Sequence, residues 1–208
     1  MPYIVTSPWW LRMVFPSGMT WHMPRKEKNI YLTFDDGPHP TVTPFVLDCL
    51  KEYNASATFF CIGKNVDQYP DIYKRILEEG HKMGNHTQSH LNARKVSNRL
   101  WVDDVKEASK RIDSDLFRPP YGRITWKGAE ELQTKGNRYR IILWDVLSGD
   151  FDEQLTAEKC IDHVIKNGKP GSIVVFHDSL KAWPRLEKAL PTVLKYYSEK
   201  GFGFKRID

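Results

Sequence analysis

Short apolar segments alternate with longer amphipathic segments along most of this chain. Residues 30–34, 57–61, 139–144 and 171–176 are rich in β-branched and aromatic side chains, a composition typical of buried strands. The segments between them carry apolar residues at helical spacing. Because strand, loop and helix repeat in this order, the pattern predicts a parallel α/β sheet with right-handed crossovers.

The bounds of these elements follow from the apolar periodicity and from turn and cap residues. Strands are expected at 30–34, 57–61, 81–85, 139–144, 171–176 and 201–207, with another ending at Phe117. Helices are expected at 43–53, 71–79, 97–113, 125–136, 156–166 and 183–201, with N-caps at Thr43 and Thr156 and a kink or break at Pro191. The order gives about six or seven strand–helix units, which fits either an open doubly wound sheet or an incomplete barrel.

The bulk composition is that of an ordinary globular chain. Its 208 residues suit one well-buried domain, and 40% of them are apolar. The formal charge is +5, but Lys and Arg are interleaved with Asp and Glu, and the largest basic cluster is only residues 25–28. A nucleic-acid partner needs a clustered basic face, so we expect no nucleic-acid binding. Nothing in the sequence specifies an oligomeric state.

The cysteines and the N-terminus bear on the redox and membrane context. Cys49, Cys61 and Cys160 have no CxxC spacing, which argues against a disulfide framework and against a thiolate zinc site. No apolar run reaches the length of a membrane span. The first residues lack a basic segment followed by an apolar one, so they are not a signal peptide. This pattern favours a cytoplasmic protein, or one from which a leader has already been removed.

Residues 1–28 are rich in Trp, Pro and Met and are too aromatic for a disordered tail. We expect them to form an arm packed on a catalytic domain of residues 29–208, closing one end of a barrel. Trp9 and Trp10 could stack on sugar rings. A structural plug is the favoured interpretation, because buried aromatic side chains usually serve the core.

Polar side chains collect where the predicted strands end. They are Asp35, Asp36, His86, His90, Arg118, Tyr121, Asp150 and His177. Since the carboxyl ends of parallel strands share one face, we expect these side chains to converge. The adjacent carboxylates of Asp35 and Asp36 repel each other, so a metal, an arginine or a shared proton is expected beside them. The alternative is a solvated acidic turn.

His86 and His90 are four residues apart. On one helical turn, this spacing would put both imidazoles on the same side, able to bind one metal ion. Two histidines and one aspartate, with open positions for water, are a common catalytic set for zinc or another divalent ion. The alternative is a pair of surface histidines.

Hydrolysis at a metal site also needs a base for the water and an acid for the leaving group. If one member of the aspartate pair holds the metal, the other is free to be the base. His177 follows a predicted strand directly and is suited to be the acid, although a core histidine bonded to a carbonyl is the alternative. In Arg118-Pro-Pro-Tyr-Gly122, two prolines fix the backbone. A rigid Arg118 could pair with an aspartate and an N–H of the turn could face an oxyanion, unless this segment is a plain structural turn.

Five segments together resemble the polysaccharide deacetylases of carbohydrate esterase family 4, the group related to chitooligosaccharide deacetylases. They are Thr33 to Pro38, His86 to His90, Arg118 to Gly122, Trp144 to Phe151 and Ile173 to His177. They occur in the family's order and cover nearly the whole chain. The resemblance implies a single-domain, distorted (β/α)7 barrel. It also implies metal-dependent removal of N- or O-linked acetyl groups from a carbohydrate such as chitooligosaccharide, peptidoglycan or xylan.

The resemblance implies roles for the residues around the aspartate pair. Asp36, His86 and His90 would hold one divalent metal ion, most often zinc, with cobalt, nickel or manganese as other options. Asp35 would be the general base that acts on the attacking water. Arg118 would pair with Asp35 and tune it.

The resemblance implies further roles at the ends of the other strands. His177 would protonate the leaving group, and Asp150 would orient and tune His177. The backbone N–H of Tyr121 would stabilise the oxyanion. The residues expected to contact the acetylated substrate are Tyr121, Phe151, Val175 and Trp144.

Some positions depart from the family pattern. Leu147 stands where an aspartate is common, and Asp150-Phe151 replaces an Asp-Trp pair. Ile173 and Val175 stand where leucine is usual. These departures bear on substrate preference more than on activity. Two alternatives stay open: an amidohydrolase acting on a small non-sugar C–N bond, and a catalytically inactive carbohydrate-binding homologue. The second is disfavoured because the base, the acid and all three ligands are present.

Overall fold

The computed structural model describes residues 4–134 and 139–208. Its strands form one parallel sheet in the order β5-β4-β3-β2-β1-β7-β6, and β8 pairs with β1. The strands are β1 Asn29–Asp35, β2 Thr58–Cys61, β3 Lys82–Asn85, β4 Leu116–Phe117, β5 Arg140–Ile141, β6 Val146–Leu147, β7 Ile173–His177 and β8 Gly203–Phe204.

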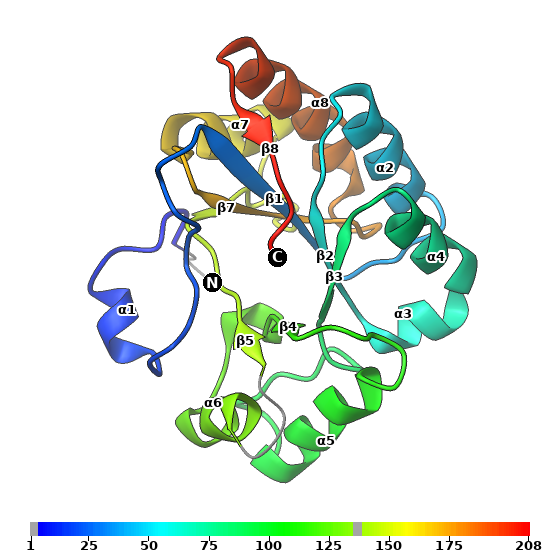
Figure 1. Cartoon of the computed structure of the whole chain (residues 1–208), viewed down its shortest axis with the longest axis vertical. Helices are drawn as coiled ribbons and strands as arrows, with labels where there is room; N and C mark the ends of the chain where they lie inside the picture. Colours follow the sequence, from blue (N-terminus) through cyan, green and yellow to red (C-terminus); the bar gives the residue numbers. More distant parts are fainter. Residues whose placement is uncertain (1–3, 135–138) are drawn as a thin grey trace.

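Helices surround this sheet. They are α1 Leu11–Val14, α2 Val42–Glu52, α3 Gly63–Gln68, α4 Pro70–Glu78, α5 Asn98–Ala108, α6 Trp126–Gln133, α7 Ala157–Asn167 and α8 Trp183–Glu199, with a 3-10 turn η1 at Pro120–Gly122. Figure 1 shows the strands curled around a centre, with the helices outside them. The predicted single-domain, distorted barrel is therefore confirmed, and the open doubly wound sheet is excluded.

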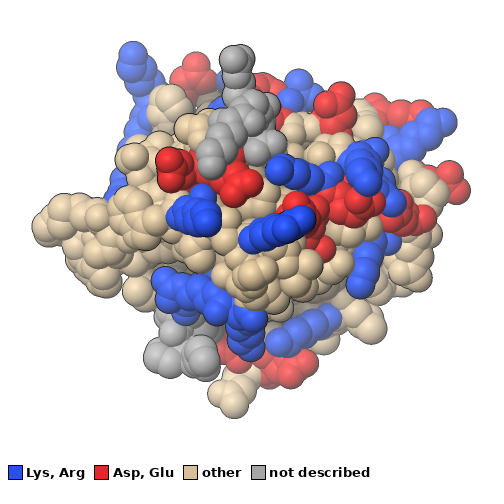
Figure 2. Space-filling view, turned by 90° about the horizontal axis from the view of Figure 1, so that it is seen from below, with Lys and Arg blue, Asp and Glu red and all other residues tan. Residues whose placement is uncertain are grey.

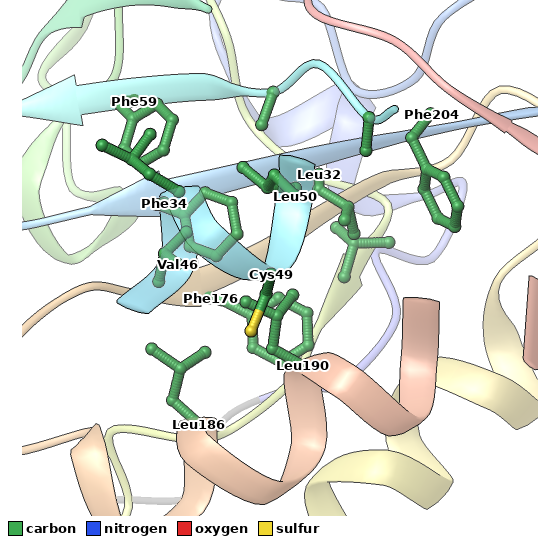
Figure 3. Close-up of a cluster of buried hydrophobic side chains, with 14 of the residues drawn as sticks. Leu32, Phe34, Val46, Cys49, Leu50, Phe59, Phe176, Leu186, Leu190 and Phe204 are labelled. Atoms are coloured by element: carbon green, nitrogen blue, oxygen red, sulfur yellow. The ribbon is translucent and has the colours of Figure 1, made fainter. Parts of the chain in front are cut away.

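An apolar layer covers the outer face of the sheet and fixes how β1 is oriented. Along β1, Ile30, Leu32 and Phe34 belong to this layer, whereas Tyr31 packs into the barrel interior. Figure 3 shows Leu32 and Phe34 facing side chains of the surrounding helices, among them Val46, Leu50, Leu186 and Leu190. Burying one such side chain contributes about 1.5–3 kcal/mol. Because strand side chains alternate, the odd-numbered residues of β1 must face inward.

A cluster of buried apolar side chains fills the barrel interior. The buried cluster there consists of Phe60, Leu116, Ile142, Ile173 and Ile207. Ile207 belongs to the C-terminal segment, and its N–H donates to Thr58 Oγ1 at 2.9 Å. Figure 1 shows the C-terminus at the centre of the ring of strands. The C-terminal segment thus closes the end of the barrel where the strands begin, and Met23 of the N-terminal arm packs against the same cluster.

The outermost strands, β5 and β6, lie on one continuous stretch of chain. β5 pairs with β4, whereas β6 pairs with β7, so the stretch crosses from one side of the barrel to the other. Each of these strands leaves an edge to which the N-terminal segment bonds. The Thr20 N–H donates to the Ile141 carbonyl at 2.9 Å, and the Leu147 N–H donates to the Val5 carbonyl at 2.8 Å. Such pairing protects strand edges from other chains.

The aromatic residues of this N-terminal segment have different environments. Trp21 is buried, whereas Trp9 is 73% exposed, so only Trp21 suits the favoured role of a plug. The segment pairs antiparallel with β6 at Thr6. It therefore runs toward the amino ends of the strands as it approaches Trp9 and Trp10, away from the converging polar residues.

The predicted N-caps have different outcomes. Thr156 caps α7 as expected, since its side chain accepts a hydrogen bond from the Lys159 N–H. Thr43 does not cap α2, whose N-cap is Thr41. Thr43 lies inside the helix, fully buried, and its hydroxyl donates to Asp178 Oδ2 at 2.6 Å. The Thr43 hydroxyl therefore makes a tertiary hydrogen bond in place of the local bond that an N-cap would make.

Several predicted bounds are wrong. The strand expected at 139–144 shrinks to β5, and β6 lies at Val146–Leu147, where no strand is expected, because the chain changes partner strand between them. The last strand shortens to β8, α5 ends at Ala108, and the short helix α3 was not predicted. α8 continues through Pro191 without a break. Residues 1–3 of the arm and the predicted helix end at Gly136 lie outside the described residues.

Charges of both signs share the surface. Figure 2 shows Lys and Arg side chains interspersed with Asp and Glu on the face that it presents, as the interleaved sequence predicts. Among the helices of residues 4–134 and 139–208, none is both long and apolar enough to cross a bilayer.

Replacing Ile207 with Ala tests whether the C-terminal segment is part of the barrel core. Ile207 is completely buried, so we expect the substitution to lower the free energy of unfolding by about 2–5 kcal/mol. Urea unfolding followed by circular dichroism measures this change. The matched control is Ile4→Ala, at a position 47% exposed, for which the change is expected within about 0.5 kcal/mol. Equal effects of the two substitutions would contradict a core role for Ile207.

Candidate active site

Alternation along the strands brings the polar strand-end residues to the inner face. β1 ends at Asp35 and β7 ends at His177, and these two residues are register partners on neighbouring parallel strands. In β4, Leu116 lies in the interior cluster and Phe117 in an outer one. Arg118, the next residue, therefore points inward. The predicted convergence occurs at the carboxyl end of the barrel.

Three predicted metal ligands come together beside the end of β1. Asp36 Oδ1 lies 3.1 Å from His90 Nε2 and 3.7 Å from His86 Nε2. One ligand atom from each residue lies within 4.8 Å of the other two. The His86 side chain is buried, whereas those of Asp36 and His90 are each 24% exposed, so solvent reaches one side of the group.

The predicted helical turn from His86 to His90 is wrong. This segment is an irregular loop after β3. Thr87 has a φ of 67° and His90 a φ of 56°, both in the left-handed region, which an α-helix does not use. The two imidazoles meet because of this loop and the position of β3, and the four-residue spacing is not the cause.

The group has the properties of a divalent-cation site. Asp36 Oδ1 is buried and has no hydrogen-bond partner among the described residues, although buried polar atoms are normally paired. His86 Nδ1 donates to the Arg118 carbonyl at 2.7 Å, which leaves the lone pair of Nε2 available beside Asp36. Two imidazole nitrogens and one carboxylate oxygen form a donor set that divalent metals accept.

The protonation states suit metal binding. Burial lowers the pKa of His86 to about 4, so its imidazole is neutral at pH 7 and can act as a ligand. Burial alone would raise the pKa of Asp36, but the contact with His90 and the nearby charge of His177 outweigh it. The pKa of Asp36 therefore lies below the ordinary carboxyl value, and its carboxylate is ionised.

Asp35 and Arg118 form a buried ion pair. Arg118 Nη1 donates to Asp35 Oδ1 and to Thr33 Oγ1, each at 2.7 Å. The other nitrogens of Arg118 donate to the carbonyls of Ile142 and Leu143, so the guanidinium is held from several sides. Its carbon also lies 4.1 Å from the centre of the Phe60 ring. This fixes the direction of Asp35 Oδ1.

His177 and Asp150 form a second buried pair. His177 Nδ1 donates to Asp150 Oδ1 at 2.8 Å, and the His177 backbone N–H donates to Asp150 Oδ2 at 2.8 Å. Ser148 Oγ donates to Asp150 Oδ1 as well. Burial lowers the pKa of His177, but the charge and hydrogen bond of Asp150 outweigh it and raise the pKa to about 9. In the metal-free protein, His177 is therefore protonated at pH 7.

The predicted substrate-contacting residues lie around these pairs. Tyr121 is 60% exposed, and its ring centre lies 4.6 Å from that of His90. The Phe151 ring centre lies 5.2 Å from that of His177. Val175 is buried two residues before His177 on β7 and shares its inward face. Trp144 packs into the barrel interior and against Gly122.

The sequence reasoning missed polar residues that support the site. Asn65 Nδ2 donates to the Asp36 carbonyl at 2.7 Å. Asp178, completely buried, accepts hydrogen bonds from the Gly37 N–H and from Thr43. Burial, with the charge of Asp36, raises the pKa of Asp178 to about 8. The position of Asp178 directly after His177 could have indicated that it belongs to the site. No local sequence pattern indicates Asn65.

Removing the charge of Asp150 tests the origin of the raised His177 pKa. In metal-free protein, we expect Asp150→Asn to lower that pKa from about 9 to below 6.5, because burial is then opposed only by the weaker effects of the Asp36 and Asp35 charges. An NMR titration of the imidazole protons measures it. A raised folded-state pKa stabilises the protein fully below pH 6.5 and loses this effect as the pH rises through about 9. The stability difference between wild type and variant should therefore shrink over that window.

Ser148→Ala is the matched control for that experiment. It removes one hydrogen bond to Asp150 and leaves the carboxylate charge in place. We expect the pKa of His177 to stay well above 6.5 in this variant. An unchanged pKa in Asp150→Asn would show that another group sets it.

Comparison with known proteins agrees with this geometry. Residues 22–139 match the polysaccharide deacetylase family. A peptidoglycan-N-acetylglucosamine deacetylase from Bacillus cereus is 38% identical over 200 residues, which span 93% of each chain. A chitooligosaccharide deacetylase from Azorhizobium caulinodans is 34% identical over 77% of this chain and 79% of its own. The chain spans only 58% and 39% of two longer peptidoglycan-N-acetylglucosamine deacetylases.

The fold is similar to solved structures as well. The Bc1960 peptidoglycan N-acetylglucosamine deacetylase superposes with a TM-score of 0.82 and 31% identity, covering 91% of both chains. The family and the Asp36–His86–His90 group together support a divalent metal ion in this protein. The motifs, the barrel and these relatives agree: the chain belongs to the polysaccharide deacetylase family, of the carbohydrate esterase family 4 type.

Proposed function

We propose that this protein removes N-linked acetyl groups from N-acetylglucosamine residues of a carbohydrate polymer, and that its metal is zinc. The substrate class rests on the relatives named for peptidoglycan and chitooligosaccharide deacetylation. Zinc is favoured because two imidazoles and one carboxylate are a ligand set that it commonly takes. Asp36, His86 and His90 would hold it. A divalent ion there supplies Lewis acidity, which polarises the acetyl carbonyl and makes water more acidic.

Asp35 is the general base of this proposal. Its carboxylate removes a proton from the water that attacks the acetyl carbonyl carbon. Arg118, 2.7 Å away, pairs with this carboxylate and fixes its direction. The backbone N–H of Tyr121, within the rigid Pro-Pro-Tyr-Gly turn, would donate to the oxyanion.

His177 is the general acid. Its Nδ1 is engaged by Asp150, so Nε2 is the atom that gives a proton to the departing amine nitrogen. Asp150 keeps this imidazole oriented and protonated until that step. Phe151, Val175 and Trp144 would surround the acetyl methyl group and exclude water from it.

One observation carries the proposal: a base with its own cation and an acid with its own anion flank the same three metal ligands. Asp35 and His177 end adjacent strands in register, and Asp36 follows Asp35 directly. A carboxylate paired with a cation and an imidazole paired with an anion, on opposite sides of one reaction centre, are an arrangement suited to acid–base catalysis. A carbohydrate-binding role would need neither buried pair.

Acetate release tests the proposed reaction. The protein is stripped with EDTA and assayed on chitooligosaccharides, peptidoglycan fragments and acetylated xylan, before and after adding zinc. We expect zinc-restored acetate release from the first two substrates. Release from xylan alone would replace N-deacetylation with O-deacetylation. No release from any substrate, with one zinc bound per chain, would contradict a carbohydrate substrate and favour a small amide.

Two single substitutions separate the base from the metal ligands. Asp35→Asn should leave zinc stoichiometry unchanged and lower kcat by about 100- to 10,000-fold, because only the proton acceptor is lost. His90→Ala should lose zinc and activity together. Zinc content by atomic absorption and initial rates of acetate release measure both quantities. Near-normal kcat in Asp35→Asn would exclude it as the base.

His177→Ala provides the corresponding test of the acid. We expect a large fall in kcat with full zinc occupancy, since His177 is not among the three clustered ligands. Phe45→Ala, at a half-buried position on the outer apolar layer, is a control for general destabilisation. Normal kcat in His177→Ala would remove it from the mechanism.

A further inference from the structure

Asp178 carries a buried carboxyl group that the proposed mechanism does not use. It follows His177 at the end of β7 and is completely buried. Its Oδ1 accepts a hydrogen bond from the Gly37 N–H at 3.0 Å. Its backbone N–H donates to the Asp35 carbonyl at 3.1 Å. One residue therefore holds the turn after β1 through both its side chain and its main chain.

The other carboxylate oxygen of Asp178 is anchored to α2. Thr43 Oγ1 donates to Asp178 Oδ2 at 2.6 Å and itself accepts from the His39 N–H at 2.8 Å. The contact with Gly37 is so close that a Cβ at that position would overlap the carboxylate. The turn residue must be glycine because Asp178 occupies the space of a side chain.

The turn that Asp178 holds contains a residue in an unfavourable conformation. Asp36 has a φ of 80°, in the left-handed region that non-glycine residues rarely adopt. Such a conformation persists only where surrounding contacts enforce it. From the opposite side of the turn, Asn65 donates to the Asp36 carbonyl and the Ile62 N–H donates to the Gly37 carbonyl at 3.0 Å. Asp178 supplies the only described side-chain bond to the Gly37 N–H.

We propose that Asp178 is a positioning residue that keeps Asp36 in its left-handed conformation, with its carboxylate facing His86 and His90. Without the bond to Gly37, the peptide after Asp36 can rotate toward ordinary backbone angles, and this rotation turns the Asp36 carboxylate away. The same contacts tie the end of β7, which carries His177, to the end of β1. This inference rests on the proposed role of Asp36 as a metal ligand.

A metal-binding measurement tests this role without relying on catalysis. Cobalt(II) is titrated into the metal-free full chain, and the affinity is read from its visible absorbance. Removing a group that orients a metal ligand usually lowers metal affinity or activity by about 10- to 100-fold. We expect Asp178→Ala to weaken cobalt binding by that factor. At saturating metal we expect kcat to fall by a similar factor while KM stays within about threefold, since Asp178 does not touch the substrate.

A conservative variant and a matched control separate positioning from simple destabilisation. Asp178→Asn keeps an oxygen for the Gly37 N–H and should recover most of the cobalt affinity. Asp145→Ala is the control, because Asp145 is also buried and bonded, to Ser172 and Arg25, but lies at the start of β6. It should lower the melting temperature and leave cobalt affinity unchanged.

The outcomes distinguish this inference from the proposed function. Wild-type protein that binds no cobalt would refute the metal site itself. Wild-type binding with equal affinity in folded Asp178→Ala would refute the positioning role alone. If Asp178→Ala does not fold, Thr43→Val replaces it, since it exchanges for a methyl group the hydroxyl that anchors Oδ2 and accepts from the His39 N–H. Unchanged cobalt affinity and kcat in Thr43→Val would then overturn the inference.

Discussion

The structure depends on the two-sided burial of β1. Its even-numbered residues must pack against the outer apolar layer, because exposing Leu32 or Phe34 would forfeit about 1.5–3 kcal/mol each. Because side chains alternate along a strand, Thr33 and Asp35 must then face the barrel interior. The apolar layer in Figure 3 is therefore what aims the proposed base, although it lies on the opposite face of the sheet.

Burying a carboxylate in this interior is costly unless another group compensates its charge. The site compensates its carboxylates in different ways. Asp35 is compensated by Arg118, which is itself buried and held by main-chain carbonyls. Asp150 is compensated by His177. Asp36 Oδ1 has only the imidazoles of His86 and His90 beside it and no hydrogen-bond partner among the described residues. Because an uncompensated buried charge is costly, this oxygen is where a cation is most favoured.

The carboxyl end of the barrel can be devoted to polar groups because other segments protect the rest of the sheet. The C-terminal segment fills the opposite end with Ile207, and the N-terminal segment bonds to the edges of β5 and β6. These contacts let one stretch of chain change partner strand between β4 and β7 without exposing backbone groups. The stretch that contains β5 and β6 is thus stabilised by the N-terminal and C-terminal segments.

The sequence by itself determined the strand-and-helix order, the apolar faces and the identity of the polar strand-end residues. These depend on local composition and on the period of alternation, which a linear sequence contains. It did not determine how His86 meets His90, since two left-handed residues and not a helix bring them together. Nor did it determine that Thr43 bonds to Asp178, or that the chain changes partner strand between β5 and β6. Only the tertiary structure decided these, because each depends on a partner more than 100 residues away or on the sheet position of a neighbouring strand, as the Thr43–Asp178 hydrogen bond shows across 135 residues.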